Sequence, residues 1–118
     1  MPLRGMRAWL ATWGLAVVRG RSMQPTLYDG DRLLVRHGAV PQEGALVVVR
    51  LPDGVVAVKR ATGRRDGGWW VERDNPEVGT DSWLVGAVPP DDVLGLVLLR
   101  YWPVRRAGRV RRRAPRGW

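Results

Sequence analysis

The chain has 118 residues, of which 45% are hydrophobic, and it carries a formal charge of +9 with no cysteine. This length fits one domain, and the apolar fraction excludes a wholly disordered chain. The absence of cysteine excludes disulfide scaffolds, thiolate metal sites and cysteine nucleophiles. A single histidine, His37, makes a histidine metal cluster or a serine–histidine triad hard to build, and we expect it to be a surface or strand-end residue.

The positive charge is concentrated at one end of the chain. Of the 20 basic residues, 19 are arginine and one, Lys59, is lysine. Seven arginines and no acidic residue follow Pro103, so residues 1–103 carry only +2. We therefore expect one near-neutral domain over residues 1–103 and a basic, disordered tail over residues 104–118.

The first apolar segment, residues 8–18, is uncharged and lies between Arg7 and Arg19. Its 11 residues are too few for a membrane-spanning helix, which needs about 20. The basic start and short apolar core are also compatible with a secretory signal, but no small-residue cleavage site follows. We expect a short helical or irregular N-terminus, buried or amphipathic, that can make weak peripheral membrane contact through Trp9 and Trp13.

Beyond Ser22 the chain alternates short β-branched runs with glycine- and proline-containing turns. Residues 52–54, Pro-Asp-Gly, lie between two such runs and predict a hairpin. Five strands with almost no helical periodicity predict a mainly β domain, either a small barrel or a sandwich. The predicted strands are residues 32–36, 45–51, 55–61, 69–72 and 93–101.

Ser22 is a candidate nucleophile because of its surroundings. It lies between Gly20 and Pro25, where a sharp backbone bend can expose its hydroxyl group. Serine before a proline-containing turn is also common in ordinary loops. The spacing alone therefore does not assign catalysis to this residue.

Lys59 is the side chain that could replace the missing histidine. Arginine stays protonated at any working pH, whereas a lysine amine, with a reference pKa of about 10.4, can lose its proton when buried. Strand alternation places Lys59 on the same face as Val55 and Ala57, and apolar surroundings lower the pKa of an amine. A neutral amine beside a serine hydroxyl can act as a general base. The alternative is a lysine at a strand end whose amine reaches solvent.

A polar loop, residues 74–82, precedes the last predicted strand and reads Asp-Asn-Pro-Glu-Val-Gly-Thr-Asp-Ser. Aspartate and asparagine at this density commonly do no more than form turns. The functional interpretation is that Asp81 and Ser82 support a site beneath Lys59.

Five short segments follow one another in a specific order: Gly20-x-Ser22-Met23-x-Pro25-Thr26-Leu27, Gly30-Asp31, Val58-Lys59-Arg60, Asp74-Asn75 and Asp81-Ser82. In this order they resemble the sequence boxes of type I signal peptidases, serine proteases with a serine–lysine dyad on a β-rich fold. The resemblance covers residues 18–103. It implies a small signal-peptidase-like β-barrel or sandwich over the catalytic domain, residues 1–103, with neither a metal nor a cofactor.

The same resemblance implies roles for individual residues. Ser22 is expected to be the nucleophile and Lys59 the general base. Asp81 and Ser82 are expected to support the dyad from the second polar loop. The oxyanion and substrate-binding region is expected to contain Gly20, Met23 and Pro25.

Within that superfamily the chain most resembles the nickel-type superoxide dismutase maturation proteases. These are short, lack a membrane anchor, and have endings like residues 74–82 and residues 99–103 of this chain. The resemblance implies that the partner is a nickel superoxide dismutase precursor, whose N-terminal extension is removed so that the new terminus can supply nickel ligands. It also implies a cytoplasmic protein, or one held peripherally at the membrane by its N-terminal segment or its arginine-rich tail.

Two departures from the signal-peptidase pattern affect hydrogen bonding. Gly20 stands where a serine often donates its hydroxyl to the oxyanion, so the Ser22 N–H and another donor must serve. Gly79 stands where a serine helps to orient the lysine, which leaves that task to Ser82, Thr80 or a water.

Two further departures concern charge. Trp83 stands where an arginine commonly pairs with the aspartate equivalent to Asp81, which leaves the partner of that carboxylate open. Arg73 replaces the usual glycine before the Asp-Asn pair. These changes affect supporting residues and leave the dyad intact.

Two other functions fit parts of the sequence. A type I signal peptidase acting on secreted preproteins uses the same chemistry, but it needs an anchor longer than residues 8–18. A non-catalytic β-barrel that binds nucleic acid through its arginine-rich tail is the second alternative. The near-neutral body lacks a basic face with interleaved aromatic residues, so we expect no specific nucleic-acid partner.

Overall fold

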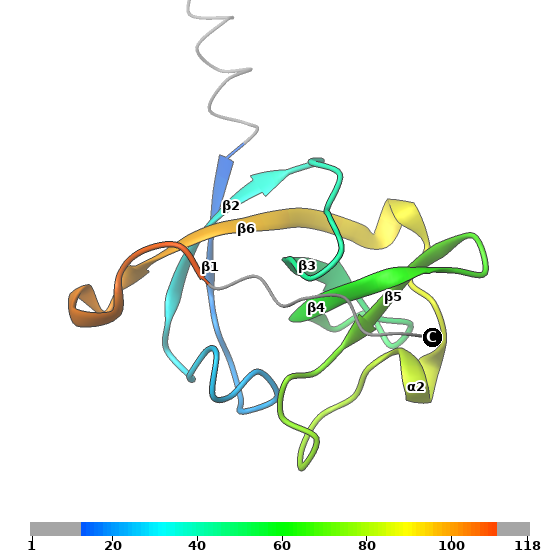
Figure 1. Ribbon diagram of the computed structural model, residues 1–118, viewed down its shortest axis with the longest axis horizontal. Helices are drawn as coiled ribbons and strands as arrows, with labels where there is room; N and C mark the ends of the chain where they lie inside the picture. The colour runs from blue at the N-terminus through cyan, green and yellow to red at the C-terminus, as the bar shows by residue number, and fades with distance from the viewer. Residues whose placement is uncertain (1–12, 111–118) are drawn as a thin grey trace, which may run out of the picture.

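The structure, a computed structural model, describes residues 13–110, which form one curved sheet of six strands (Figure 1). Neighbouring strands are antiparallel, and their order across the sheet is β1-β2-β6-β3-β4-β5. The mainly β fold predicted from the sequence is confirmed, in the form of one open sheet. The strands are β1 (Trp13–Val17), β2 (Arg32–His37), β3 (Leu46–Arg50), β4 (Val56–Arg65), β5 (Gly68–Glu72) and β6 (Val93–Trp102).

The five predicted strands correspond to β2 through β6. The predicted hairpin is confirmed, because β3 and β4 pair with Val48 opposite Val58. β4 continues beyond residue 61 to Arg65, since its second half pairs with β5. A tight turn makes this possible: Asp66 has a φ of 53°, in the left-handed region that aspartate tolerates better than most residues.

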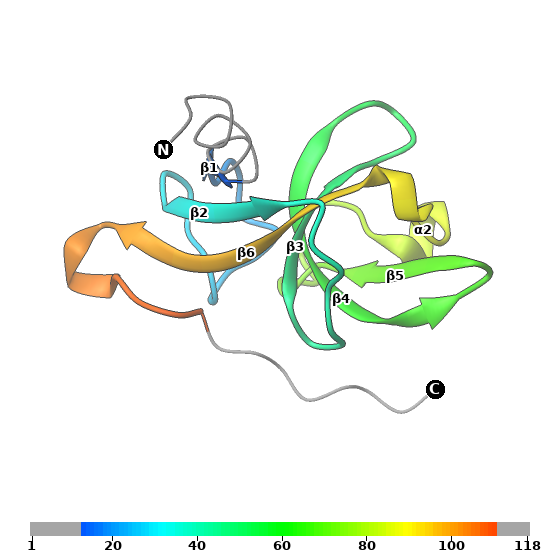
Figure 2. The same ribbon diagram turned by 90° about the horizontal axis from the view of Figure 1, so that it is seen from above.

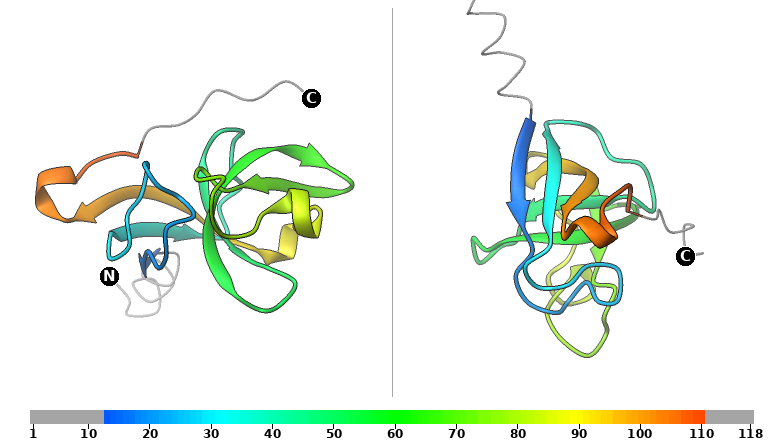
Figure 3. Two further views of the ribbon diagram at one scale, coloured as in Figure 1. Left: turned by 90° about the horizontal axis from the view of Figure 1, so that it is seen from below. Right: turned by 90° about the vertical axis from the view of Figure 1, so that its left-hand side faces the viewer.

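The strand β1 is not predicted by the sequence pattern. It pairs with β2 along one edge of the sheet, where the two strands lie side by side (Figure 3). Its outward-facing residues, Leu15 and Val17, are apolar and exposed, so the usual alternation of apolar and polar residues is missing. The rest of the expected irregular N-terminus, residues 1–12, lies outside the described residues.

The helices are short. α2 covers Ser82–Val85, and two 3-10 turns, η1 and η2, cover Pro90–Asp92 and Val104–Arg106. Among residues 13–110, no helix is both long enough and apolar enough to cross a membrane.

Two apolar clusters lie on opposite faces of the β3–β4 hairpin, because side chains alternate along a strand. Val47 and Val49 face the first cluster, which includes Val71 of β5. Leu46 and Val48 face the second cluster, which lies against β2 and the β1–β2 loop, residues 18–31. Figure 2 shows β6 running along the molecule and joining the β1–β2 side to the β3–β5 side.

The segment after β6 differs from the predicted tail. Residues 104–110 fold back along β6, where Arg100 exchanges two backbone hydrogen bonds with the returning chain. Arg106 forms an ion pair with the buried Asp31, which also binds Arg100. A buried carboxylate needs such partners, so part of the charge that indicated a solvated tail is used inside the fold. Residues 111–118 lie outside the described residues.

Candidate active site

Ser22 lies in the β1–β2 loop, which is closed at its base by two backbone hydrogen bonds. The N–H of Val18 donates to the Asp31 carbonyl, and the N–H of Gly30 donates to the Val18 carbonyl, both at 2.8 Å. On the far side of Ser22, the buried side chains of Met23 and Leu27 anchor the loop in the second apolar cluster. These contacts fix the loop on both sides of Ser22. The serine itself is half-buried.

Lys59 lies on β4 opposite Val47 and is only 3% exposed. Its Nζ lies 3.1 Å from the Oγ of Ser22, so the structure brings these two predicted residues together. Burial lowers the pKa of Lys59; the negative charge of Asp81 opposes this, and the positive charge of Arg73 adds to it. Lys59 makes no ion pair within residues 13–110.

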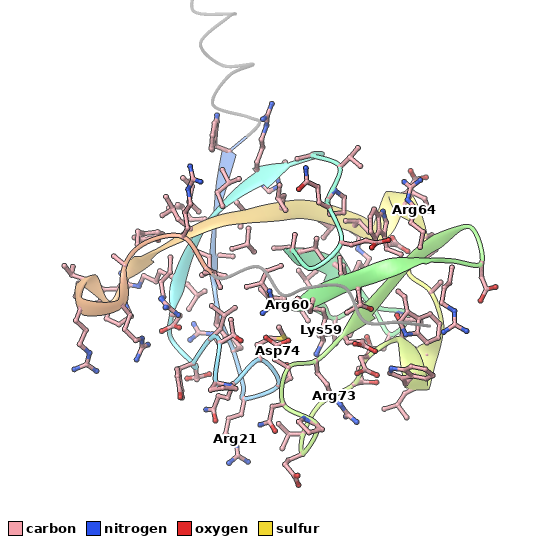
Figure 4. The ribbon with its side chains drawn as sticks, in the orientation of Figure 1. Arg21, Lys59, Arg60, Arg64, Arg73 and Asp74 are labelled. Atoms are coloured by element: carbon pink, nitrogen blue, oxygen red, sulfur yellow. The ribbon has the colours of Figure 1, made fainter. Side chains whose placement is uncertain are left out.

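The surroundings of Lys59 come from β4 and from the β5–α2 loop, residues 73–81. Figure 4 shows Lys59, Arg60, Asp74 and Arg73 gathered at the lower end of β4. In the same view Arg64, further along β4, lies away from this group, and Arg21 points outward from the loop that carries Ser22.

Asp74 joins three parts of the chain. Its carboxylate is fully buried and accepts hydrogen bonds from Arg60 Nη2 at 2.7 Å and from the Thr26 hydroxyl at 2.5 Å. Its backbone N–H donates to the Met23 sulfur at 3.4 Å. These contacts fasten the β5–α2 loop to β4 on one side and to the β1–β2 loop on the other.

Asn75 holds the backbone at the nucleophile position. Its N–H donates to the Ser22 carbonyl at 2.8 Å, and its side-chain amide donates to the Arg21 carbonyl at 3.0 Å. The sequence marks this asparagine only as part of a resemblance box and assigns it no role. The only sequence signal for this contact is the high density of aspartate and asparagine in the loop. That density is equally typical of an ordinary turn, so it does not predict the contact with Ser22.

Asp81 and Ser82 lie at the start of α2, and among the described residues the Lys59 amine forms its hydrogen bond with Ser22 and no ion pair with Asp81. The Asp81 carboxylate caps α2 by accepting from the Trp83 N–H at 3.1 Å. The Ser82 hydroxyl accepts from the Val71 N–H at 2.8 Å, which ties α2 to β5. Of the two, Asp81 affects Lys59 through its charge, which raises the pKa of the lysine.

The partner of Asp81, left open by the sequence, is Arg73. The backbone N–H of Arg73 donates to Asp81 Oδ2 at 3.2 Å, and the side-chain Nε of Arg73 lies 3.6 Å from the same oxygen. Trp83, at the position where an arginine was expected, instead donates from Nε1 to Glu72 at 2.6 Å. Its ring packs edge-on against Trp70, with 5.2 Å between centroids.

Gly79 lies directly against the serine. A Cβ placed on Gly79 would be 2.7 Å from the Ser22 Cβ, and its φ of 87° is unfavourable for any other residue. No side chain fits there, which explains why a lysine-orienting serine is absent at this position.

The three residues expected in the oxyanion and substrate-binding region are placed differently from one another. Gly20, with a φ of 81°, donates its N–H to the Asp29 carboxylate at 2.8 Å. Met23 is buried in the core, and Pro25 is exposed on the loop.

A cavity of about 180 Å³ opens beside Ser22, between the end of β1 and the start of β4. Its walls are mostly valine and alanine, so it suits a small apolar side chain. Val55 and Val56 at its rim are both more than half exposed. The lining residues are Ala16, Val17, Val18, Arg19, Ser22, Met23, Val48, Val55, Val56, Ala57 and Val58. Within the described part of the chain, no cluster of His, Cys, Asp or Glu side chains could hold a metal ion.

Comparison with known proteins places the chain in a family. The model of the family described as Peptidase S24-like matches residues 10–84, more than half of the chain. The chain is also similar to mitochondrial inner membrane protease subunit 1 of Xenopus tropicalis, with 29% identity over 120 aligned positions that cover 80% of this chain and 72% of that protein. The matched region contains Ser22, Lys59 and the whole β5–α2 loop. The chain therefore belongs to the Peptidase S24-like family, within the signal-peptidase-like superfamily of peptidases.

Proposed function

We propose that the protein is a serine endopeptidase of the signal peptidase kind, in which Ser22 is the nucleophile and Lys59 the general base. The observation that carries this proposal is the 3.1 Å distance between Lys59 Nζ and Ser22 Oγ. A protonated lysine cannot accept a proton, and burial of Lys59 favours the neutral amine that can.

In the proposed mechanism, Lys59 takes the hydroxyl proton as Ser22 Oγ forms a bond to the scissile carbonyl carbon. The C–N bond then breaks, and Lys59 returns the proton to the leaving amine, which gives an acyl-enzyme. A water next loses a proton to Lys59 and attacks the ester, so that Ser22 leaves and recovers its proton. Backbone N–H groups at the Ser22 bend stabilise the oxyanion in both halves of the reaction.

The substrate is proposed to bind as an extended strand. Residues 56–59 of β4 pair with β3 on one side, and pairing with β5 begins only at Arg60. The other edge of this segment lies beside the cavity and Ser22, so an added strand would present its scissile bond to the nucleophile. The apolar cavity would then hold a small side chain of the precursor.

We further propose that the substrate is the precursor of a nickel superoxide dismutase, from which an N-terminal extension is removed. This proposal depends on the resemblance of residues 74–82 and 99–103 to the maturation proteases of that enzyme. It places the protein in the cytoplasm, where it makes at most peripheral contact with the membrane.

The test is co-expression with a nickel superoxide dismutase precursor, followed by mass measurement of the dismutase N-terminus. We expect one shortened species with the wild-type protein and the full-length precursor with Ser22→Ala. An unshortened precursor in both cells would contradict the proposed substrate. A precursor shortened equally by Ser22→Ala would contradict the proposed nucleophile.

A second candidate function is that of a type I signal peptidase acting on secreted preproteins at a membrane, which the name of the similar protein from Xenopus tropicalis, an inner membrane protease subunit, favours. Fractionation of cells that express the protein distinguishes these two candidate functions. Recovery in the membrane fraction after a high-salt wash would favour this candidate, whereas release by salt favours the dismutase precursor. Membership of a peptidase family argues against the remaining alternative, a non-catalytic nucleic-acid-binding module.

A further inference from the structure

Arg73 spans the β5–α2 loop from its first residue to its end. Its side chain is 23% exposed and reaches Asp81, with Nε 3.6 Å from Oδ2. Its Nη1 donates a hydrogen bond to the carbonyl of Gly79. One guanidinium therefore holds both the carboxylate that caps α2 and the backbone at Gly79.

We infer that Arg73 is a positioning residue that clamps the β5–α2 loop against Ser22 and balances the charge of Asp81 at Lys59. This inference rests on the proposed function, because it assigns Arg73 to the same dyad. It adds a residue that neither the sequence motifs nor the comparisons assign to the site.

The clamp acts on the nucleophile through Gly79. The backbone of Gly79 lies so close to Ser22 that an added Cβ would be 2.7 Å from the Ser22 Cβ and 3.7 Å from both the serine Oγ and Lys59 Nζ. A loop in this position limits where the serine side chain can move. Because Arg73 holds the Gly79 carbonyl, release of that bond frees the part of the loop that touches the dyad.

The charge balance acts on Lys59. The charges that affect its pKa are those of Asp81, which raises it, and of Arg73, which lowers it. The other carboxylate on this loop, Asp74, is bound to Arg60, and the residue opposite Lys59 on β3 is Val47. Without Arg73, only burial opposes the raising effect of Asp81, so the pKa of Lys59 increases relative to the wild type and less of the amine is neutral.

The chain offers a direct measurement, because Lys59 is its only lysine. Labelling with lysine that carries 13C at Cε alone gives one signal, whose shift against pH reports the titration of Lys59 in the full chain without any substrate. We expect a higher titration midpoint in Arg73→Gln. Arg73→Lys keeps the charge but adds a second lysine signal; there we expect the signal that the wild type also shows to keep a midpoint near its wild-type value. The matched control is Arg64→Gln, because Arg64 is an exposed arginine further along β4. This variant should leave the titration midpoint of Lys59 unchanged.

Cleavage kinetics separate the clamp from the charge. Loss of nucleophile positioning costs up to about 100-fold in rate. We therefore expect Arg73→Lys to lower the plateau of kcat/KM by about 10-fold or more without moving its acidic limb. Arg73→Gln should lower the plateau and also move the limb to higher pH, since activity requires the neutral amine. Gly79→Ala, which displaces the loop without altering charge, should behave like Arg73→Lys.

A wild-type midpoint and a wild-type plateau in Arg73→Gln would overturn the inference. So would a uniform loss of activity with no change of midpoint, because a merely structural arginine predicts that result. Failure of the proposed function looks different: cleavage then survives in Ser22→Ala, whereas the lysine titration still reports on Arg73. If Arg73→Gln does not fold, Arg73→Lys is combined with Gly79→Ala: a double variant that loses no more than Gly79→Ala alone supports a clamp that acts through Gly79, and additive losses or an unchanged plateau in Arg73→Lys overturn it.

Discussion

Lys59 and Arg60 are adjacent basic residues on β4 that are buried to the same degree, 3% and 2% exposed, on opposite faces of the strand. Arg60 is fully bound: it forms an ion pair with Asp74 at 2.7 Å and donates to the Gly44 carbonyl at 2.9 Å. Lys59 has one hydrogen-bond partner, the Ser22 hydroxyl, and no ion pair among the described residues.

The difference follows from the chemistry of the two groups. A guanidinium stays charged at any working pH, so a buried arginine must be paired. An amine can lose its proton, so a buried lysine can remain without a carboxylate by becoming neutral. Arg60 therefore holds the loops together, whereas Lys59 can lose its proton and, in the proposed mechanism, accept one from Ser22.

The largest effect is expected when Lys59 is replaced by arginine, so that both positions carry a guanidinium. We expect Lys59→Arg to lose cleavage by about 10,000-fold or more, as when a dyad or triad member is removed, because the guanidinium keeps the charge but cannot accept a proton. The measurement is single-turnover cleavage of the precursor by purified protein.

Lys59→Ala is the matched variant for this experiment, and its loss should equal that of Lys59→Arg. Circular dichroism of both variants checks that the fold is retained. Near-normal cleavage by Lys59→Arg would show that Lys59 acts through charge alone, which is incompatible with a general base.

The second prediction removes the pairing of Arg60. Arg60→Met leaves the Asp74 carboxylate buried without its cation, which should lower the free energy of unfolding by about 3–5 kcal/mol. Chemical denaturation followed by tryptophan fluorescence measures this change. The control is Arg50→Met: the Arg50–Asp92 pair has the same chemistry but is 53% and 35% exposed, so its loss should cost at most about 1 kcal/mol.

Equal losses in the two variants would contradict this assignment, since burial would then not distinguish the two ion pairs. A loss in Arg60→Met that is restored by Asp74→Asn in the same chain would support it, because the second change removes the uncompensated charge.

The sequence predicts most of the fold because local signals carry it. Turns such as residues 52–54 separate β-branched runs, and β3 and β4 pair as these signals require. The strand β1 could not be predicted, because the exposed apolar residues Leu15 and Val17 conceal its alternation. Its pairing depends on β2, which is distant in sequence.

The candidate site also contains residues that could be predicted from the sequence and residues that could not. Ser22 and Lys59 could be predicted because they stand in the segments that resemble the sequence boxes of type I signal peptidases; the residues alone left an ordinary loop serine and a strand-end lysine as alternatives. The pairing of Arg73 with Asp81 could not, because charge alone does not say which of the arginines reaches a given carboxylate. The same holds for Asp31, whose partners Arg100 and Arg106 are about 70 residues away in sequence.

The last prediction sharpens the comparison by removing the Lys59 amine altogether. Lys59→Met keeps a long apolar side chain of similar shape and abolishes catalysis, but it also removes a polar group that burial disfavours. We expect the free energy of unfolding at neutral pH to rise by about 1–3 kcal/mol, the range found for buried polar groups in proteins. Arg60→Met changes stability in the opposite direction, although both variants replace a buried cation of β4 by methionine.

The pH dependence of the stability gained in Lys59→Met shows whether the gain comes from removing the buried amine or from packing. Because the pKa of Lys59 is lower in the folded protein than its ordinary value of 10.5, the unfolded chain binds more protons between the two values, and the stability of the wild type rises with pH across that window. The part of the penalty that is due to the charge of the amine is complete below the folded pKa and vanishes above 10.5. The advantage of Lys59→Met should therefore be largest at low pH and shrink as the pH approaches 10.5. Denaturation curves between neutral and alkaline pH measure it, and an advantage independent of pH would mean that the gain comes from packing rather than from the buried amine.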